Sequence, residues 1–154
     1  MKIYFAHPAF TDTQRAFKAR FLNEFEAALK KRCANKGTGV PAIIDPFDYS
    51  PTIEKDPQYK ERFSRSVASL CCRLLRDCFL VVAVADDHDN GVAFELGFAH
   101  ALNIPAITVS EGGAADETNA MLFGTSEARI SHVLEHERMA VLADMVYGFS
   151  MCAG

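Results

Sequence analysis

The feature that most constrains this 154-residue sequence is the apolar run at residues 78–85, which a helical pattern follows directly. The run has no polar face, so it predicts a central strand of a parallel sheet, buried on both sides. After a turn at residues 86–90, apolar residues recur with helical spacing at Val92, Leu96, Ala99 and Leu102. A strand followed by a helix in this way favours an open parallel sheet, in which ligands bind at the carboxyl ends of the strands.

Glu95 is the acidic residue that this pattern places closest to the ligand side. It is predicted in the first turn of the helix that follows the central strand. The helix dipole and the free N–H groups of a first turn favour an anion, so Glu95 is expected to keep its charge. A solvated acid that caps its own helix would show the same pattern, so position alone leaves both interpretations open.

The rest of the chain alternates strands and helices. Strands are predicted at 2–6, 40–44, 105–109 and 128–133, and helices near 11–32, 59–76, 118–123 and 136–149. A proline-containing stretch at 45–58 is predicted as a long loop on the ligand side, and 110–117 as a mobile loop. This order predicts an α/β sandwich of three layers with a parallel sheet of about five strands. Since no repeat or linker divides the chain, one domain over residues 1–154 is expected.

Charge and composition argue against several classes of partner and site. The net charge of -4 argues against nucleic acid or an anionic membrane as the main partner. Five cysteines without framework spacing favour a reducing, cytoplasmic compartment. The histidines, His7 among them, are scattered; they are interpreted as surface residues, and no metal site is predicted. There is no GxGxxG after the first strand and no P-loop lysine, so dinucleotide binding and NTP hydrolysis lack support.

Three motifs, in one order along the chain, are similar to those of a known family. The opening strand and first loop contribute Tyr4 and Phe10. The most specific motif runs Asp89-x-Gly91-x-x-x-Glu95-Leu-Gly-x-Ala, and Asn119-x-Met121 follows it. Together, over residues 3–124, these motifs resemble the nucleoside 2-deoxyribosyltransferases.

The resemblance implies a flavodoxin-like fold and transfer of 2-deoxyribose between nucleobases through a covalent glycosyl-enzyme, in nucleoside salvage. Glu95 would be the nucleophile, and the Tyr4 hydroxyl would hold its carboxylate. Substrate-binding positions would be Asp89 and, across a subunit interface, Asn119 for the sugar 5′-hydroxyl, Phe10 for the base, and also Gly91, Ser69 and Met121. The resemblance implies no cofactor and no metal. It also implies a homo-oligomer built from dimers, often a hexamer, with shared active sites.

One position departs from the family pattern. The family usually carries an aspartate or asparagine about two turns before the acid that opens the central strand, and uses it on the nucleobase. In this chain, counting back from Asp77 reaches Ser69, and serine is a poor general acid near neutral pH. Asp45 or Asp48, after the second strand, could take its place. The choice between purine and pyrimidine bases stays open.

The chemistry of the motif residues agrees with this resemblance and leaves two alternatives. A carboxylate beside the anomeric carbon stabilises and captures an oxocarbenium-like state, and a second base in place of water then completes transfer. One alternative is an N-glycosidase that hydrolyses nucleosides or nucleoside 5′-monophosphates, although Asp89 would repel a phosphate. The other alternative is a non-catalytic nucleoside-binding domain.

Overall fold

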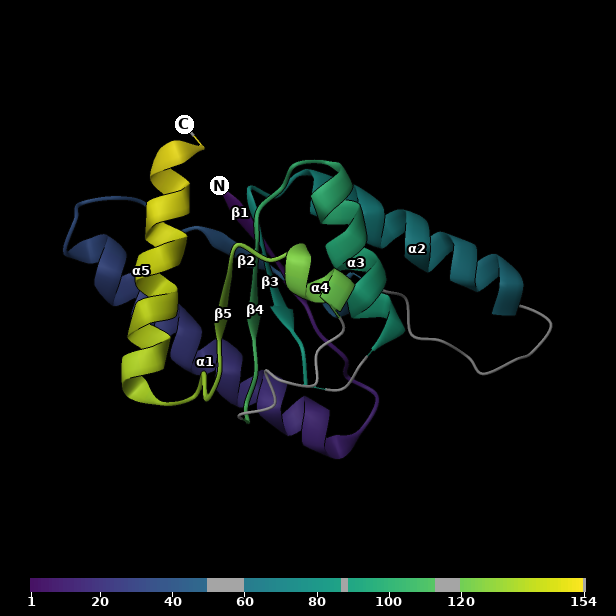
Figure 1. Ribbon diagram of the computed structural model, residues 1–154, viewed down its shortest axis with the longest axis horizontal. Helices are drawn as coiled ribbons and strands as arrows, with labels where there is room; N and C mark the ends of the chain where they lie inside the picture. Colours follow the sequence, from purple (N-terminus) through teal and green to yellow (C-terminus); the bar gives the residue numbers. More distant parts are fainter. Residues whose placement is uncertain (50–59, 87–88, 113–119, 154) are drawn as a thin grey trace.

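A parallel sheet with strand order β2-β1-β3-β4-β5 forms the middle layer of the computed structural model of this chain (Figure 1). The structure describes residues 1–49, 60–86, 89–112 and 120–153. The strands are Lys2–Ala6 (β1), Ala42–Ile44 (β2), Leu80–Val84 (β3), Ala106–Val109 (β4) and Ala128–Ile130 (β5). This strand order is that of flavodoxin-like folds, so the predicted fold class is confirmed.

Helices cover both faces of the sheet. The helices are Asp12–Ala34 (α1), Lys60–Arg76 (α2), Asn90–Ala101 (α3), Ala120–Gly124 (α4) and His136–Cys152 (α5), with a short 3-10 helix at Pro46–Asp48 (η1). Helices α1 and α5 lie on one side of the sheet, and α2, α3 and α4 lie on the other (Figure 1). None of the helices in the described part of the chain is long and apolar enough to cross a membrane.

The alternation of side chains along β1 creates two separate apolar layers. Ile3 and Phe5 pack on the side of α1 and α5, where phenylalanines of α1 form much of the core. Tyr4 and Ala6 point to the opposite side, into the layer that also contains Leu75 of α2 and residues of α3. Tyr4 is therefore a polar side chain carried by a central strand into the layer beneath α3.

The predicted elements agree with the observed ones, apart from their ends. The second strand begins two residues later than predicted, and the fifth ends at Ile130, shortly before His132 takes a positive φ of 52°. The proline-containing loop begins with η1, but residues 50–59 lie outside the described part of the chain, as does much of the predicted mobile loop. The one shift that changes the interpretation of the site is at α3, which begins at Asn90.

Candidate active site

A short hydrogen bond between Tyr4 and Glu95 forms the centre of the candidate site. Tyr4 Oη donates to Glu95 Oε1 over 2.5 Å. Tyr4 is fully buried on β1, and Glu95 is partly buried on α3. Because α3 follows β3, the direct neighbour of β1, two residues far apart in sequence meet near the carboxyl ends of adjacent strands.

Burial controls the charge of Glu95. Desolvation raises the pKa of this carboxyl from 4.5, and hydrogen bonds from Tyr4 and Cys71 and the charge of His7 lower it, while Asp89 raises it again. The balance leaves the pKa at about 7. The expectation of a first-turn acid that keeps its charge easily is therefore wrong. Since α3 begins at Asn90, Glu95 lies in its second turn. There the helix dipole stabilises an anion by less than desolvation destabilises it.

Tyr4 and Cys71 are both neutral donors beside Glu95. Burial and the nearby Glu95 charge raise the pKa of Tyr4 well above its ordinary value, so the hydroxyl keeps its proton. Burial also raises the pKa of the Cys71 thiol, which lies near enough to Tyr4 and Glu95 to affect the pKa of both. Sequence analysis missed Cys71, although it shares the apolar face of α2 with Val67 and Leu74 at helical spacing.

Asp89 and Gly91 form the beginning of α3. The Asp89 carboxylate caps the helix, because its Oδ1 accepts the Val92 N–H over 2.9 Å. A Cβ on Gly91 would lie 2.9 Å from the same oxygen, which is closer than real Cβ contacts. Glycine at 91 therefore lets the Asp89 carboxylate fold back over the first turn, near Glu95.

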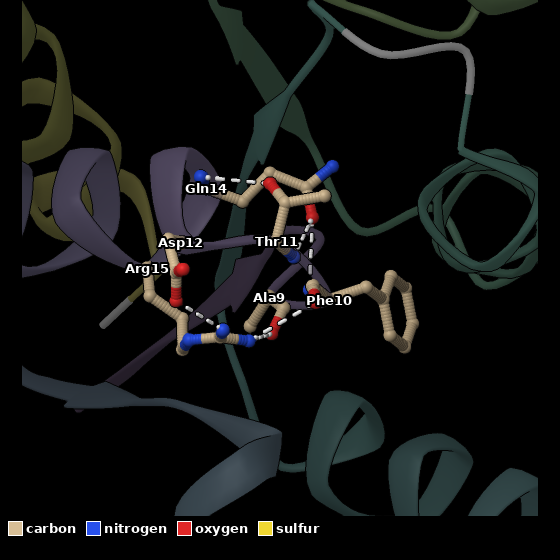
Figure 2. Close-up of polar contacts among 6 residues, drawn as sticks. All are labelled: Ala9, Phe10, Thr11, Asp12, Gln14 and Arg15. Carbon is tan, nitrogen blue, oxygen red and sulfur yellow. Dashed lines mark hydrogen bonds and ion pairs between the residues drawn. The ribbon is translucent and has the colours of Figure 1, made fainter.

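The loop after β1 is held by polar contacts, most of them between a side chain and a backbone group, which Figure 2 shows. The N–H groups of Phe10 and Thr11 donate to Gln14 Oε1 over 2.8 and 3.0 Å, and Thr11 caps α1 in a capping box. Arg15 Nη1 donates to the carbonyls of Ala9 and Phe10, 3.0 Å to each. The Phe10 ring points away from these contacts and is 70% exposed (Figure 2). The backbone of Phe10 is fixed while its ring is presented to solvent.

Phe47 of η1 is a second aromatic residue in this region, which sequence analysis did not select. Its ring meets the Phe10 ring edge-on, with centroids 6.2 Å apart, and it is partly exposed. The pair forms an aromatic corner beside the carboxyl ends of β1 and β2.

A buried polar cluster lies beneath this corner. His7 Nε2 is 3.1 Å from Asp45 Oδ1, and Lys18 of α1 forms an ion pair with the other oxygen of Asp45. Only 4% of His7 is exposed, so the interpretation of His7 as a surface residue is wrong: the Phe5 ring stacks on it, and the Phe47 ring lies against it at a tilt of 38°. The position of His7 directly after a buried strand is the sequence signal that could have indicated its burial.

Asp45 is not suited to be a proton donor. Burial raises the pKa of Asp45, but hydrogen bonds from His7 and Lys18 lower it by more. The net result is a pKa of about 2, below the ordinary 3.8. An ionised carboxylate only accepts hydrogen bonds. Asp45 therefore does not replace the acid that is missing at position 69.

Two other residues selected from the sequence are exposed at the surface, and a third lies outside the described part of the chain. Ser69 is exposed on α2, two residues before Cys71 and so on a different face of the helix. Met121 of α4 is 78% exposed. Asn119 lies outside the described residues.

No metal centre is evident in the described part of the chain, where no three histidine, cysteine or acidic side chains are grouped to hold an ion. All five cysteines are described, and each is a free thiol. The polar groups around Glu95 are a phenol, a thiol, an imidazole and a second carboxylate, which suits acid–base and covalent chemistry.

The family model for nucleoside 2-deoxyribosyltransferases matches residues 3–121. The chain belongs to this family, which confirms the resemblance drawn from its motifs, and the match supports an enzyme that acts on nucleosides and nucleobases. No curated protein matches the chain.

Three solved structures with the same fold are distant from this chain in sequence. A 2-deoxyribosyltransferase of Bacillus psychrosaccharolyticus is 20% identical, with TM-score 0.54 over 84% of this chain and 85% of that one. A conserved protein of Enterococcus faecalis is 18% identical, with TM-score 0.64 over 95% and 98%. A CMP N-glycosidase of Clostridium botulinum is 15% identical, with TM-score 0.58 over 95% and 99%. At these identities the likeness establishes the fold alone.

Proposed function

We propose that this protein transfers the 2-deoxyribosyl group between nucleobases through a covalent ester on Glu95, in nucleoside salvage. The observation that supports this most directly is the 2.5 Å hydrogen bond by which the buried Tyr4 holds the Glu95 carboxylate at the ligand end of the sheet. A group held in one orientation is prepared for attack on a bound sugar.

The proposed reaction is a double displacement. The Glu95 oxygen that Tyr4 does not hold attacks the anomeric carbon, and the base leaves with the electron pair of the broken C–N bond and takes up a proton. A nitrogen of the second base then attacks the same carbon, loses its proton, and releases the Glu95 carboxylate. Two inversions retain the configuration of the sugar.

Binding roles follow from the same proposal. Asp89 accepts a hydrogen bond from the sugar 5′-hydroxyl with its carboxylate, which caps α3 through Oδ1. Phe10 packs on the base, and Asn119 of a neighbouring subunit completes the sugar site. Gly91 allows the approach of Asp89; Ser69 and Met121 are exposed and are proposed as substrate contacts only through the family resemblance. Free nucleosides are preferred because Asp89 repels a phosphate.

A second copy of the chain is the proposed partner, and a partly exposed apolar stripe along α3 and its C-cap supports this: Phe94 and Leu102 are exposed, and Phe98 is partly buried. Phe94, Phe98 and Leu102 follow at intervals of four residues, and the Phe94 and Phe98 rings stack at 6.1 Å. Phe94 is 55% exposed although it is next to Glu95 in the chain. A dimer across this stripe would cover apolar surface beside both active sites. The five free thiols agree with the expected cytoplasmic location.

Hydrolysis of the N-glycosidic bond is the second candidate. The described part of α2 presents the thiol of Cys71 to Glu95, and Ser69 is exposed, so no family-type acid is available there to assist a leaving and an entering base. Water would be the acceptor in this case. A nucleoside-binding domain without catalysis is the third candidate, but it would gain nothing from an oriented carboxylate at this position.

The deciding experiment is incubation with deoxyinosine, with and without adenine or cytosine, followed by chromatography of the products. A new deoxynucleoside supports transfer, whereas hypoxanthine and free sugar alone would support hydrolysis. Loss of turnover with retained nucleoside binding in Glu95→Ala would exclude the binding domain. Absence of any reaction with deoxyinosine, thymidine and a deoxynucleotide would contradict both enzymatic proposals.

A further inference from the structure

His7 has an environment that neither the family motifs nor the proposed reaction explains. It directly follows β1 and is almost completely buried. Its ring lies 4.5 Å from the Phe5 ring and 5.1 Å from the Phe47 ring, measured between centroids. A polar ring in such surroundings is stable only if both of its nitrogens have hydrogen-bond partners.

The two partners of His7 are both acceptors. Nδ1 is 3.1 Å from the Pro8 carbonyl oxygen, and Nε2 is 3.1 Å from Asp45 Oδ1. A carbonyl oxygen only accepts, and an ionised carboxylate only accepts. A neutral imidazole donates from one nitrogen only, so it would leave the other nitrogen facing an acceptor. The imidazolium ion donates from both nitrogens and satisfies both contacts.

Asp45 is held as an anion by other groups in addition to His7. Its Oδ1 also accepts the Phe47 N–H over 2.9 Å, and its second oxygen pairs with Lys18. The Lys18 ammonium in turn lies 5.7 Å from the centroid of the Phe47 ring. With His7 charged, the cluster has two cations and one anion, which leaves one positive charge in excess at the carboxyl ends of β1 and β2.

We propose that His7 is a buried imidazolium that acts as a positioning residue for the candidate nucleophile: its charge favours the ionised form of the Glu95 carboxylate over the protonated form. Four described side chains act on Glu95 from the surrounding elements, namely Tyr4 of β1, Cys71 of α2, Asp89 before α3, and His7. Tyr4 and Cys71 are neutral donors and Asp89 is an anion. His7 is the cation among these four, so it opposes both the desolvation of Glu95 and the repulsion from Asp89.

This inference deepens the proposed function, because an ionised Glu95 is required for nucleophilic attack, but the charge of His7 can be tested without any activity. The first measurement is nitrogen NMR of the wild-type protein labelled with 15N-histidine, at neutral pH. Two protonated ring nitrogens on His7 are expected. A neutral tautomer would overturn the proposal, and no variant that must fold is needed for this result.

The second measurement is an NMR titration of the Glu95 side-chain carboxyl in wild type, His7→Phe and His100→Phe. His7→Phe keeps an aromatic ring in contact with Phe5 and Phe47 but removes the charge. The Glu95 titration should move to higher pH by about half a unit or more. His100→Phe, at an exposed site in the last turn of α3, should leave it unchanged. Equal midpoints in wild type and His7→Phe would contradict the proposal.

Activity distinguishes this proposal from the proposed function. If the enzyme acts on deoxynucleosides, the acid limb of kcat/KM should follow the same shift in His7→Phe, with recovery at high pH. If the wild type has no activity but Glu95 still titrates higher in His7→Phe, the electrostatic role stands and the transferase proposal fails.

Discussion

Tyr4 Oη and Glu95 Oε1 are 2.5 Å apart, although they come from β1 and from the second turn of α3. The strand is fully buried at Tyr4, so the hydroxyl has the carboxylate as its partner in place of water. The consequence is an acid in an apolar layer whose charge depends on a few neighbouring donors.

Removal of the Tyr4 hydroxyl should weaken the site in a pH-dependent way. Tyr4→Phe deletes the donor that lowers the pKa of Glu95, so the pKa of the carboxyl should rise above its present value of about 7. Hydrogen bonds to charged groups contribute about 1.5–3 kcal/mol, which predicts about a 10- to 100-fold lower turnover at neutral pH. Rates measured between pH 6 and 9 should converge at the alkaline end. Tyr147→Phe on α5 is the control, and a uniform loss at every pH would contradict this account.

The buried charge of Glu95 should also reduce the stability of the protein. The pKa of Glu95 is about 7 in the folded state, against an ordinary 4.5, so wild-type stability should fall as pH rises from 4.5 to 7. Glu95→Gln keeps an acceptor for Tyr4 without a charge. The free energy of unfolding of Glu95→Gln should exceed that of the wild type by up to about 3 kcal/mol at pH 8, and the two should differ little near pH 4.5. Urea unfolding at both pH values measures this, and an equal or lower stability at pH 8 would count against it.

Asp45 should show the opposite dependence on pH. Its pKa is about 2 in the folded state, against an ordinary 3.8, so its contribution is present above 3.8 and is lost as pH falls toward 2. Asp45→Asn leaves His7 and Lys18 without their buried counter-ion and should cost about 3–5 kcal/mol at pH 6. The cost should shrink by about 2 kcal/mol at pH 2. Asp144→Asn breaks an exposed pair with Arg32 and should cost less than about 1 kcal/mol at either pH.

Two glycines of α3 should respond to alanine in opposite ways. Gly91→Ala places a Cβ 2.9 Å from Asp89 Oδ1, so Asp89 must move and the helix loses its cap, at a cost of about 1 kcal/mol. The same change should raise KM for a deoxynucleoside. Gly97→Ala meets nothing within 4 Å and should stabilise the helix by up to about 1 kcal/mol without changing KM. Equal effects of the two changes on stability and KM would argue against a role for Gly91 in placing Asp89.

A charge in the apolar stripe of α3 should separate the proposed subunits. Phe94→Asp leaves the monomer fold unchanged because the side chain is mostly exposed, but it opposes burial of the stripe against a second copy. Sedimentation should show smaller species, and specific activity should fall with them. Val141→Asp, at an exposed apolar position on α5, is the matched control and should keep the wild-type assembly. Unchanged assembly in Phe94→Asp would place the interface elsewhere.

The layers of the fold and the choice of Glu95 follow from local patterns in the sequence. The apolar run at 78–85, the helical spacing after it and the Asp89–Glu95 motif predict a strand, a helix and an acid at the ligand end of the sheet, because periodicity and capping depend on neighbouring residues. Those elements are present, with small shifts at their ends.

The charge states and the close contacts were decided by the tertiary structure. His7 is buried because Phe47 and Asp45 come from a later segment, and Cys71 reaches Glu95 because α2 packs beside α3. The pKa of Glu95 rises because the sheet and helices exclude water from it. Desolvation and Coulomb interactions sum over groups that are close in space and distant in the chain, and no local pattern contains that sum.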